Sequence, residues 1–370
     1  NSIPLHEPKF IGNEKKYLEE TINSTFVSSV GPSVNSFESK IAEFTGVKYA
    51  IAVVSGTAAL HLSLKIAGVE ENTEVITQSL TFVATTNAIH YCNADPVFLD
   101  VDRDTMGLSP KALKQFLEHN CEQRKDGLYN KISGKKVSAC ISMHTFGLCG
   151  RIDEIVKVCK EFSLPVLEDA AEGLGSFYKN KHVGTFGLMG VLSFNGNKII
   201  TTGGGGAILT NSKKIANKIN LISRNSKQGN KWEYKYSELG FNYRMPSINA
   251  QLGLAQNKKI VKFVSLKRKL YLRYRSAFKK VLGIKLFKEP KYSKSNYWLQ
   301  AIVLDKPSIK NQRLILKRTN SLGFGTRPVW NLLNKNRHLK LCPSMNLDTA
   351  KDLEKRIINL PSGARLCQKK

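Results

Sequence analysis

Three short segments of the sequence combine residue types that could bind a ligand and do chemistry. The first is Ser55-Gly56-Thr57, between an apolar strand-like run and a helical pattern. The first N–H groups of a helix have no partner within it, and glycine lets a ligand approach the backbone closely. This junction therefore suits a phosphate group. The alternative is an ordinary helix cap made by a Ser or Thr side chain.

The second segment places carboxylates at the end of a buried strand. It reads Val166-Leu167-Glu168-Asp169-Ala170-Ala171-Glu172. A buried carboxylate needs a cation or a hydrogen-bond donor as its partner. One candidate is a metal ion, although no His/Asp cluster surrounds the segment in the sequence. The other is a protonated ring nitrogen, and the plain alternative is an Asp that caps a helix.

The third segment holds Lys198, just past an apolar strand in a turn rich in Asn and Gly. Most lysines are solvated surface groups, but an amine held beside a core strand can serve as a nucleophile. The glycines Gly203–Gly206 follow and indicate backbone that passes close to another group. The segment does not match the P-loop pattern.

In chain order, these segments supply the parts of a pyridoxal phosphate site. The helix start would hold the phosphate, and an aromatic residue, Phe82, would cover the ring. Asp169 would keep the pyridine nitrogen protonated, and Lys198 would form a Schiff base with the aldehyde. We therefore expect pyridoxal 5'-phosphate as the cofactor and no metal ion.

The ordered motifs resemble those of the DegT/StrS family of nucleotide-sugar aminotransferases, which have the aspartate-aminotransferase (type I) fold. The resemblance covers nearly the whole chain. Its motifs are Ser55-Gly56-Thr57-Ala58-Ala59-Leu60, Thr81-Phe82-Val83-Ala84-Thr85, Glu168-Asp169-Ala170-Ala171, Ser193-Phe194 with Lys198, Thr201-Thr202-Gly203-Gly204-Gly205-Gly206, and Gly240-Phe241-Asn242-Tyr243-Arg244. The branch that aminates UDP-linked 4-keto-6-deoxy-N-acetylhexosamines is the most similar, through Ser28–Gly31, Ser193–Lys198, Ser295–Trp298 and Thr326–Trp330.

The resemblance implies roles for the residues of the cofactor site. Lys198 is the Schiff-base lysine, Asp169 the pyridinium partner and Phe82 the stacking ring. Glu172 stands near the ring hydroxyl, where the family often has Gln or His, so it departs from the commoner pattern. The residues implied to hold the phosphate are Gly56, Thr57 and Ser193.

The resemblance also implies partners and substrate contacts. The residue matching Asn242 comes from the neighbouring subunit in relatives, which implies a homodimer with composite sites. The expected substrate contacts are Ser29, His144, Arg327 and Trp330. His144 has a structural histidine as its alternative, and Trp298 and Trp330 have core packing as theirs.

The implied reaction is transamination from L-glutamate to a nucleotide-linked 4-keto-6-deoxy sugar, with UDP-2-acetamido-2,6-dideoxy-4-ketohexose as the expected substrate. The product would be a 4-amino sugar for surface glycans. A GDP-linked 4-ketosugar and a 3-ketosugar are alternatives. A basic nucleic-acid-binding protein and a regulatory protein on an inactive aminotransferase fold are the non-enzymatic alternatives.

Apolar strands that alternate with helices must position these segments. The pattern predicts an α/β fold with a large domain, residues 1–255, whose mostly parallel sheet is covered by helices on both faces. Residues 256–370 are expected to form a smaller α+β domain. There, an apolar face from Ile260 to Val281 predicts a long helix. A strand over 296–304 and helices over 309–321 and 349–358 are expected to follow.

The charge of the chain is uneven. The 370 residues carry 57 Lys+Arg and 29 Asp+Glu, a net charge of +28, and residues 201–370 account for the surplus. We assign most of it to solvated faces and expect neither a nucleic-acid partner nor a membrane segment. Seven cysteines without a C-x-x-C pair, and no signal pattern at the start of the sequence, favour a cytoplasmic location.

Overall fold

The computed structural model describes residues 2–229 and 232–367. Its main feature is a seven-stranded sheet in the order β1-β11-β10-β7-β6-β2-β3. Only β11 runs opposite to the others, so the predicted mostly parallel sheet is confirmed. The strands are β1 (Tyr49–Val53), β2 (Glu74–Gln78), β3 (Asp95–Leu99), β6 (Val137–Met143), β7 (Val166–Asp169), β10 (Met189–Ser193) and β11 (Gly206–Thr210).

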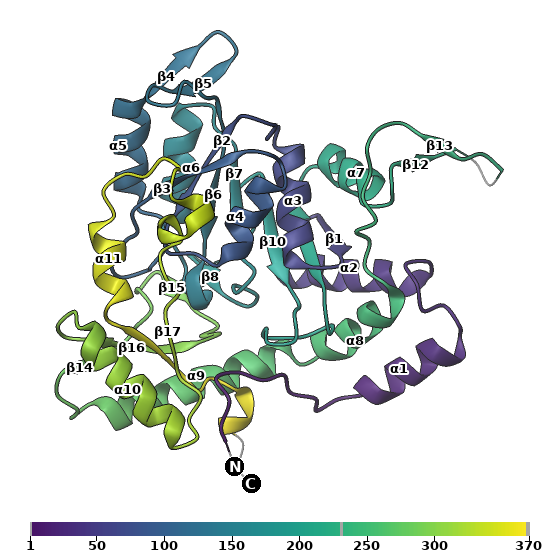
Figure 1. The fold of residues 1–370 in the computed structure, drawn as a ribbon. Coiled ribbons are helices and arrows are strands. Elements are labelled where there is room, and N and C mark those ends of the chain that lie inside the picture. Colours follow the sequence, from purple (N-terminus) through teal and green to yellow (C-terminus); the bar gives the residue numbers. More distant parts are fainter. Residues whose placement is uncertain (1, 230–231, 368–370) are drawn as a thin grey trace.

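Helices cover both faces of this sheet (Figure 1). Successive strand residues point to opposite faces, so Ile51 packs in one hydrophobic cluster and Ala52 in the other. On the side of Ile51 lie α3 (Gly56–Ile66), α4 (Val83–His90) and α7 (Lys213–Ile222), and on the side of Ala52 lie α2 (Pro32–Thr45), α5 (Pro110–Asn120) and α6 (Ile152–Glu161). Burial on both faces explains why the strands are apolar throughout.

A second, antiparallel sheet follows in the order β14-β16-β18-β17. Two helices pack on one face of it, around Ile302 and Ile358. The strands are β14 (Ile284–Leu286), β16 (Gln300–Leu304), β17 (Arg327–Pro328) and β18 (Ile357–Leu360), and the helices are α9 (Ile260–Phe278) and α10 (Ile309–Ser321).

Three of the predicted elements are corrected in this region. The last helix, α11, spans Asp348–Glu354, and the end of the predicted 349–358 helix is strand β18. This strand forms because Ile357 and Ile358 pair with β16 and each is buried, Ile358 in this apolar cluster and Ile357 in the cluster around Ala52. The predicted strand over 296–304 starts only at Gln300, and the long helix ends at Phe278, before Val281.

The N-terminal residues, which were expected in the large domain, hydrogen-bond to the C-terminal part of the chain. The backbone N–H of Ile3 donates to the carbonyl of Gly323, and the N–H of Ser362 donates to the carbonyl of Leu5.

The remaining elements are α1 (Glu14–Asn23), α8 (Ser247–Asn257), β4 (Cys121–Arg124), β5 (Gly127–Asn130), β8 (Phe177–Tyr178), β9 (Lys181–His182), β12 (Lys227–Gln228), β13 (Lys235–Tyr236), β15 (Ser293–Lys294), and short 3₁₀ turns at Thr145–Gly147, Leu333–Lys335, Arg337–Leu339 and Ala364–Cys367. The division at residue 255 stays a prediction.

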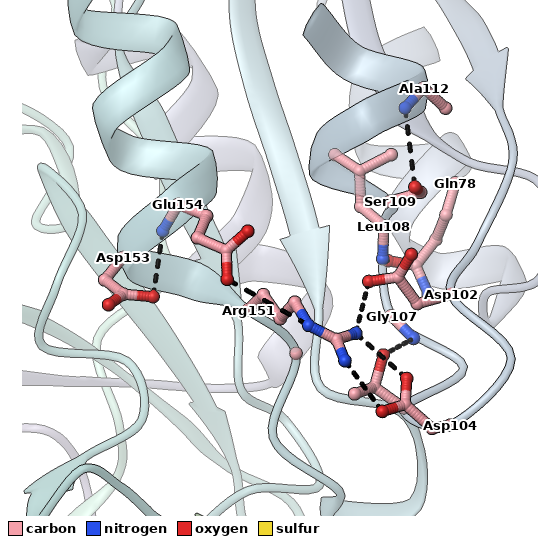
Figure 2. A network of polar contacts seen from close by, with 12 residues as sticks. Gln78, Asp102, Asp104, Gly107, Leu108, Ser109, Ala112, Arg151, Asp153 and Glu154 are labelled. Atoms are coloured by element: carbon pink, nitrogen blue, oxygen red, sulfur yellow. Dashed lines mark hydrogen bonds and ion pairs between the residues drawn. The ribbon is translucent and has the colours of Figure 1, made fainter. Parts of the chain in front are cut away.

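Arg151 ties the loop after β3 to the start of α6 (Figure 2). Its guanidinium donates to the carboxylates of Asp102, at 2.5 Å, and Asp104, at 2.7 Å. Next to this network, Oε1 of Gln78 accepts the N–H groups of Leu108 at 2.9 Å and Met143 at 3.0 Å. The network thus holds loops at the edge of the sheet where the strands end.

The cysteines and the lengths of the helices bear on the expected location of the protein. All seven cysteines are free thiols. Within residues 2–229 and 232–367, no helix combines the length and apolar character needed to cross a bilayer.

Candidate active site

A cavity of about 670 Å³ lies at the edge where the parallel strands end. In open α/β sheets, ligands bind at the carboxyl ends of the strands. The cavity wall includes residues at four such ends: Ser55 after β1, Met143 of β6, Asp169 of β7 and Ser193 of β10. The sheet thereby brings together segments that are far apart in the sequence.

The start of α3 forms one part of the wall. The side chain of Ser55 caps the helix and accepts the N–H of Ala58 at 3.0 Å. Gly56 and Thr57 line the cavity. A Cβ on Gly56 would lie 3.0 Å from the Cβ of Ser193, so glycine allows the helix to start directly against the end of β10. The cap and an anion site coexist here, since the first N–H groups of α3 remain available.

The carboxylate of Asp169 is 2% exposed and lines the cavity. The hydroxyl of Thr85, in α4, donates to Oδ2 at 2.7 Å, and the N–H of Ala171 donates to Oδ1 at 3.2 Å. Thr81 lies just before α4, with its hydroxyl 3.0 Å from that of Thr85. These donors orient the carboxylate and leave it further acceptor capacity for a cationic group in the cavity.

Lys198 lies in the turn after β10, where its N–H donates to the carbonyl of Asn195 at 3.0 Å. Its Nζ is 3.4 Å from Oε1 of Glu172 and 4.0 Å from the ring centroid of Trp298. The side chain of Lys198 is 13% exposed, and Nζ faces the cavity that Glu172 and Trp298 also line. An amine, a carboxylate and an aromatic face therefore meet at one point of the wall.

Glu172 is buried beside this amine. The N–H of Phe146 donates to its Oε2 at 2.8 Å. Burial raises the pKa of Glu172 to about 7, and the nearby charge of Lys198 offsets only part of that rise. The group therefore changes charge close to neutral pH.

The structure places His144, an expected substrate contact, away from the cavity. Its ring is fully buried and does not line the cavity. Nδ1 accepts the N–H of Gly150 at 3.2 Å, so the ring proton is on Nε2 and is donated to Glu168 at 3.0 Å. Because both ring nitrogens are engaged within the protein, the contacts favour the alternative of a structural histidine, and the role of His144 stays a prediction.

The other expected contacts divide into two groups. Arg327, Trp330 and Phe82 line the cavity, and Phe82 is 46% exposed with its ring centroid 5.9 Å from that of Trp330. Ser29 is half-buried and Asn242 is exposed, and neither lines the cavity of this chain. The roles assigned to these residues stay predictions.

Sequence reasoning gave no role to several residues of the wall. Leu5 reaches it from the N-terminal segment, and Asn195 and Asn197 flank the lysine turn. Thr85 lies outside the wall, but from α4 its hydroxyl holds Asp169, and it belongs to the Thr81–Thr85 motif. Trp298, whose sequence context allows either core packing or a ligand contact, lies in the wall.

The wall fits pyridoxal phosphate. A helix start for a phosphate, a buried carboxylate for a protonated ring nitrogen and an amine for an aldehyde all line one cavity. Within the described residues, no cluster of His, Cys, Asp and Glu could hold a metal ion. The fold and this site define an aminotransferase of the type I fold that depends on pyridoxal phosphate.

The chain belongs to the DegT/DnrJ/EryC1/StrS aminotransferase family, whose model matches residues 8–370. EpsN of Bacillus subtilis (strain 168), named a pyridoxal phosphate-dependent aminotransferase, is 38% identical over 99% of this chain and 92% of that protein. GDP-perosamine synthase of Escherichia coli O157:H7 is 35% identical, over 97% of this chain and 93% of its own.

A solved structure agrees. Helicobacter pylori PseC, an aminotransferase involved in the biosynthesis of pseudoaminic acid, matches with a TM-score of 0.89 and 28% identity. The match covers 99% of this chain and 95% of PseC. The protein is therefore a sugar aminotransferase with pyridoxal phosphate as its cofactor. The expected family, type I fold and cofactor are confirmed. The findings favour an enzyme over a nucleic-acid-binding or regulatory protein.

Proposed function

We propose that the enzyme transfers the amino group of L-glutamate to C4 of a nucleotide-linked 4-keto-6-deoxy sugar. UDP-2-acetamido-2,6-dideoxy-4-ketohexose is the first candidate, and the product is a 4-amino sugar for surface glycans. One observation carries the proposal: Lys198, Asp169 and the start of α3 line a single cavity. The motif likeness at Ser295–Trp298 and Thr326–Trp330 supports the UDP-linked substrate.

Pyridoxal phosphate, when bound, supplies an electron sink for negative charge on the carbon next to the amino nitrogen. In our proposal, Lys198 anchors the aldehyde, and its freed Nζ then removes a proton from Cα of the amino donor. The carboxylate of Asp169 holds a proton on the ring nitrogen, since a buried carboxylate stabilises an adjacent cation. Gly56 and Thr57 bind the phosphate through their backbone N–H groups.

Substrate recognition is assigned to the part of the cavity wall that contains Arg327 and Trp330. Arg327 stands there with its Nη1 donating to Oδ1 of Asn320 at 2.9 Å and to the carbonyl of Thr326 at 2.8 Å. These two contacts hold the guanidinium while leaving other N–H donors for a diphosphate. Trp330 offers an aromatic surface to the sugar or the base.

A GDP-linked 4-ketosugar is the second candidate. Its support comes from relatives named GDP-perosamine synthase in Escherichia coli O157:H7, Vibrio cholerae and Caulobacter vibrioides, which are 35%, 33% and 33% identical to this chain. The nucleotide base and the sugar are thus the first properties to measure.

We further propose a homodimer in which Asn242 completes the partner's site. Asn242 is exposed and stands outside the cavity of its own chain. Near Ser29, apolar side chains are also open to solvent in the single chain, with Phe26 58% and Val30 65% exposed. A second copy of the chain would cover such side chains.

The test of the reaction is mass spectrometry of products from L-glutamate and a panel of UDP- and GDP-linked 4-ketosugars and a 3-ketosugar. We expect the 4-amino sugar and 2-oxoglutarate with the wild type, and neither with Lys198→Ala. Lys262→Ala, at an exposed position of α9, is the matched control. If glutamate is converted but no sugar of the panel is aminated, the substrate proposal is wrong while the aminotransferase activity stands.

A further inference from the structure

Trp298 makes two separate contacts with the turn that carries Lys198. Its indole N–H donates to the carbonyl of Asn197 at 2.7 Å, and its ring face lies 4.0 Å from Nζ of Lys198. The side chain is 5% exposed and lines the cavity. One contact therefore holds the backbone of the turn, and the other holds the amine.

The backbone of Trp298 is itself fixed. Its N–H donates to Oδ1 of Asn296 at 2.7 Å, and its carbonyl accepts Nζ of Lys267 at 3.0 Å. Lys267 is fully buried in α9, which lowers the pKa of its amine well below the usual range, and its Nζ also donates to the carbonyl of Ser362. The indole thus projects from a rigid support.

The same support reaches the other partner of the amine. The side chain of Asn296 donates to the carbonyl of Glu172 at 2.8 Å and to that of Leu174 at 2.9 Å. Asn296 therefore links the carboxylate-bearing loop to the backbone of Trp298. The carboxylate and the indole face, which both contact Nζ of Lys198, are thus linked through one short segment of the chain.

A catalytic lysine needs such a support at one stage of the reaction. Once the amino donor has replaced the lysine on the cofactor, the lysine side chain is free to rotate about four bonds. Its amine must nevertheless stay at the substrate carbon to move a proton. As the amine takes the proton from Cα it becomes an ammonium group, and the electron-rich face of the indole attracts this cation and narrows the positions that it samples.

We propose that Trp298 is a positioning residue for Lys198, an inference that rests on the function proposed for that lysine. The indole N–H holds the turn at Asn197, and the ring face keeps the released amine at the cavity wall. Trp298 lies within residues 256–370 and Lys198 within residues 1–255, so the position of the lysine depends on contact between these two parts of the chain.

Two substitutions separate the contacts. Trp298→Phe keeps an aromatic face and removes the N–H, whereas Trp298→Leu removes both. Tyr297→Leu is the matched control, because Tyr297 is the adjacent residue, is 2% exposed, and stacks on Tyr271 with 4.2 Å between ring centroids. The Tyr297→Leu variant perturbs the packing of the same segment and leaves the contacts of Trp298 with Lys198 and Asn197 in place.

The first measurement is the half-reaction with L-glutamate and with glutamate deuterated at Cα. We expect Trp298→Leu to lower its maximal rate about tenfold, the scale of a buried cation–π contact, and to raise the deuterium isotope effect. The KM for glutamate stays within about twofold, since uniform substrate binding is untouched. Trp298→Phe retains the rate within about threefold, and Tyr297→Leu shows the wild-type isotope effect.

The second measurement needs no cofactor. Hydrogen exchange of the backbone amides of residues 194–198, followed by mass spectrometry on the cofactor-free protein, should accelerate in Trp298→Phe and Trp298→Leu but not in Tyr297→Leu. Wild-type exchange and an unchanged isotope effect in Trp298→Leu would overturn the inference, as would a raised KM for glutamate at an unchanged maximal rate. If Lys198→Ala instead keeps the half-reaction, the function proposed for Lys198 fails separately.

Discussion

The carboxylate of Glu172 lies 3.4 Å from Nζ of Lys198, and both side chains line the same cavity. Because Glu172 is buried, its pKa is raised to about 7 even though the lysine favours the ionised form. The pair is therefore a carboxylate facing an amine above this pH and a neutral carboxyl group facing it below. Its charge state changes within the range in which cells work.

Replacing this carboxylate should simplify the dependence of catalysis on pH. We expect the rate of the glutamate half-reaction in the wild type to show an inflection near pH 7, where Glu172 titrates. Glu172→Gln, which resembles the neutral form, should lack it. Stopped-flow rates from pH 5 to 9 measure this, with Glu154→Gln at an exposed position as control. The same inflection in all three proteins would assign it to another group.

The same substitution should alter how stability depends on pH. The pKa of Glu172 is raised from 4.5 to about 7 on folding, so the folded chain binds more protons between these values. Its favourable contribution is complete below 4.5 and is lost as the pH rises through 7. Between pH 4 and 8, the stability of cofactor-free Glu172→Gln should gain up to about 3 kcal/mol relative to the wild type. Urea unfolding at both pH values tests this, and a constant difference would contradict it.

A second buried carboxylate should behave in the opposite way. Burial by itself raises the pKa of Glu168, but the hydrogen bond from His144 and those from the N–H groups of Gly187 and Gly184 outweigh it, and the net pKa is lowered. Its contribution is present above the ordinary pKa of 4.5 and is lost as the pH falls through the lower folded value.

Glu168→Gln should therefore lower the free energy of unfolding at pH 7 by about 2–4 kcal/mol, since several buried donors lose a charged acceptor. The loss should shrink as the pH falls below 4.5, because the contribution of the wild-type carboxylate is then progressively lost. Chemical denaturation at pH 7 and pH 4 measures it. An equal loss at both pH values would show that packing, and not the charge of Glu168, sets the effect.

The proposed composite site predicts complementation between two inactive chains. In a mixed dimer of Lys198→Ala and Asn242→Ala, one site carries both defects and the other carries neither. Random reassociation after unfolding should therefore restore about a quarter of the wild-type activity. Refolding each variant alone is the control. A mixture that stays inactive, or a chain that sediments as a monomer, would contradict the role of Asn242 in the partner's site.

Arg327 should matter for the sugar and not for the amino donor. We expect Arg327→Ala to raise the KM for the nucleotide sugar at least about tenfold, because a charge-assisted contact to a phosphate is lost. The glutamate half-reaction should stay at the wild-type rate. Arg318→Ala, an exposed residue of α10, is the control. If Arg327→Ala slowed the glutamate and the sugar half-reactions equally, Arg327 would act in a step common to both and not in sugar binding.

Much of the fold and the cofactor site could be predicted because the signals are local. Apolar strands between helices indicate a sheet covered on both faces, and the carboxyl ends of parallel strands meet at one edge. That edge is where Ser55, Asp169 and Ser193 are found. In each case, a residue type and its neighbours along the chain were sufficient.

Contacts between distant segments were decided by the tertiary structure. Trp298 reaches a carbonyl 101 residues away, at Asn197, and no local pattern encodes that approach. His144 followed a strand like a site residue, yet it is closed off by Glu168 of the adjacent β7 and by Gly150. Ile357–Leu360 continues a helical pattern in sequence but is a strand, because pairing with β16 buries its isoleucines. The residue types thus determined which chemistry is present, and long-range packing determined which of them face the cavity.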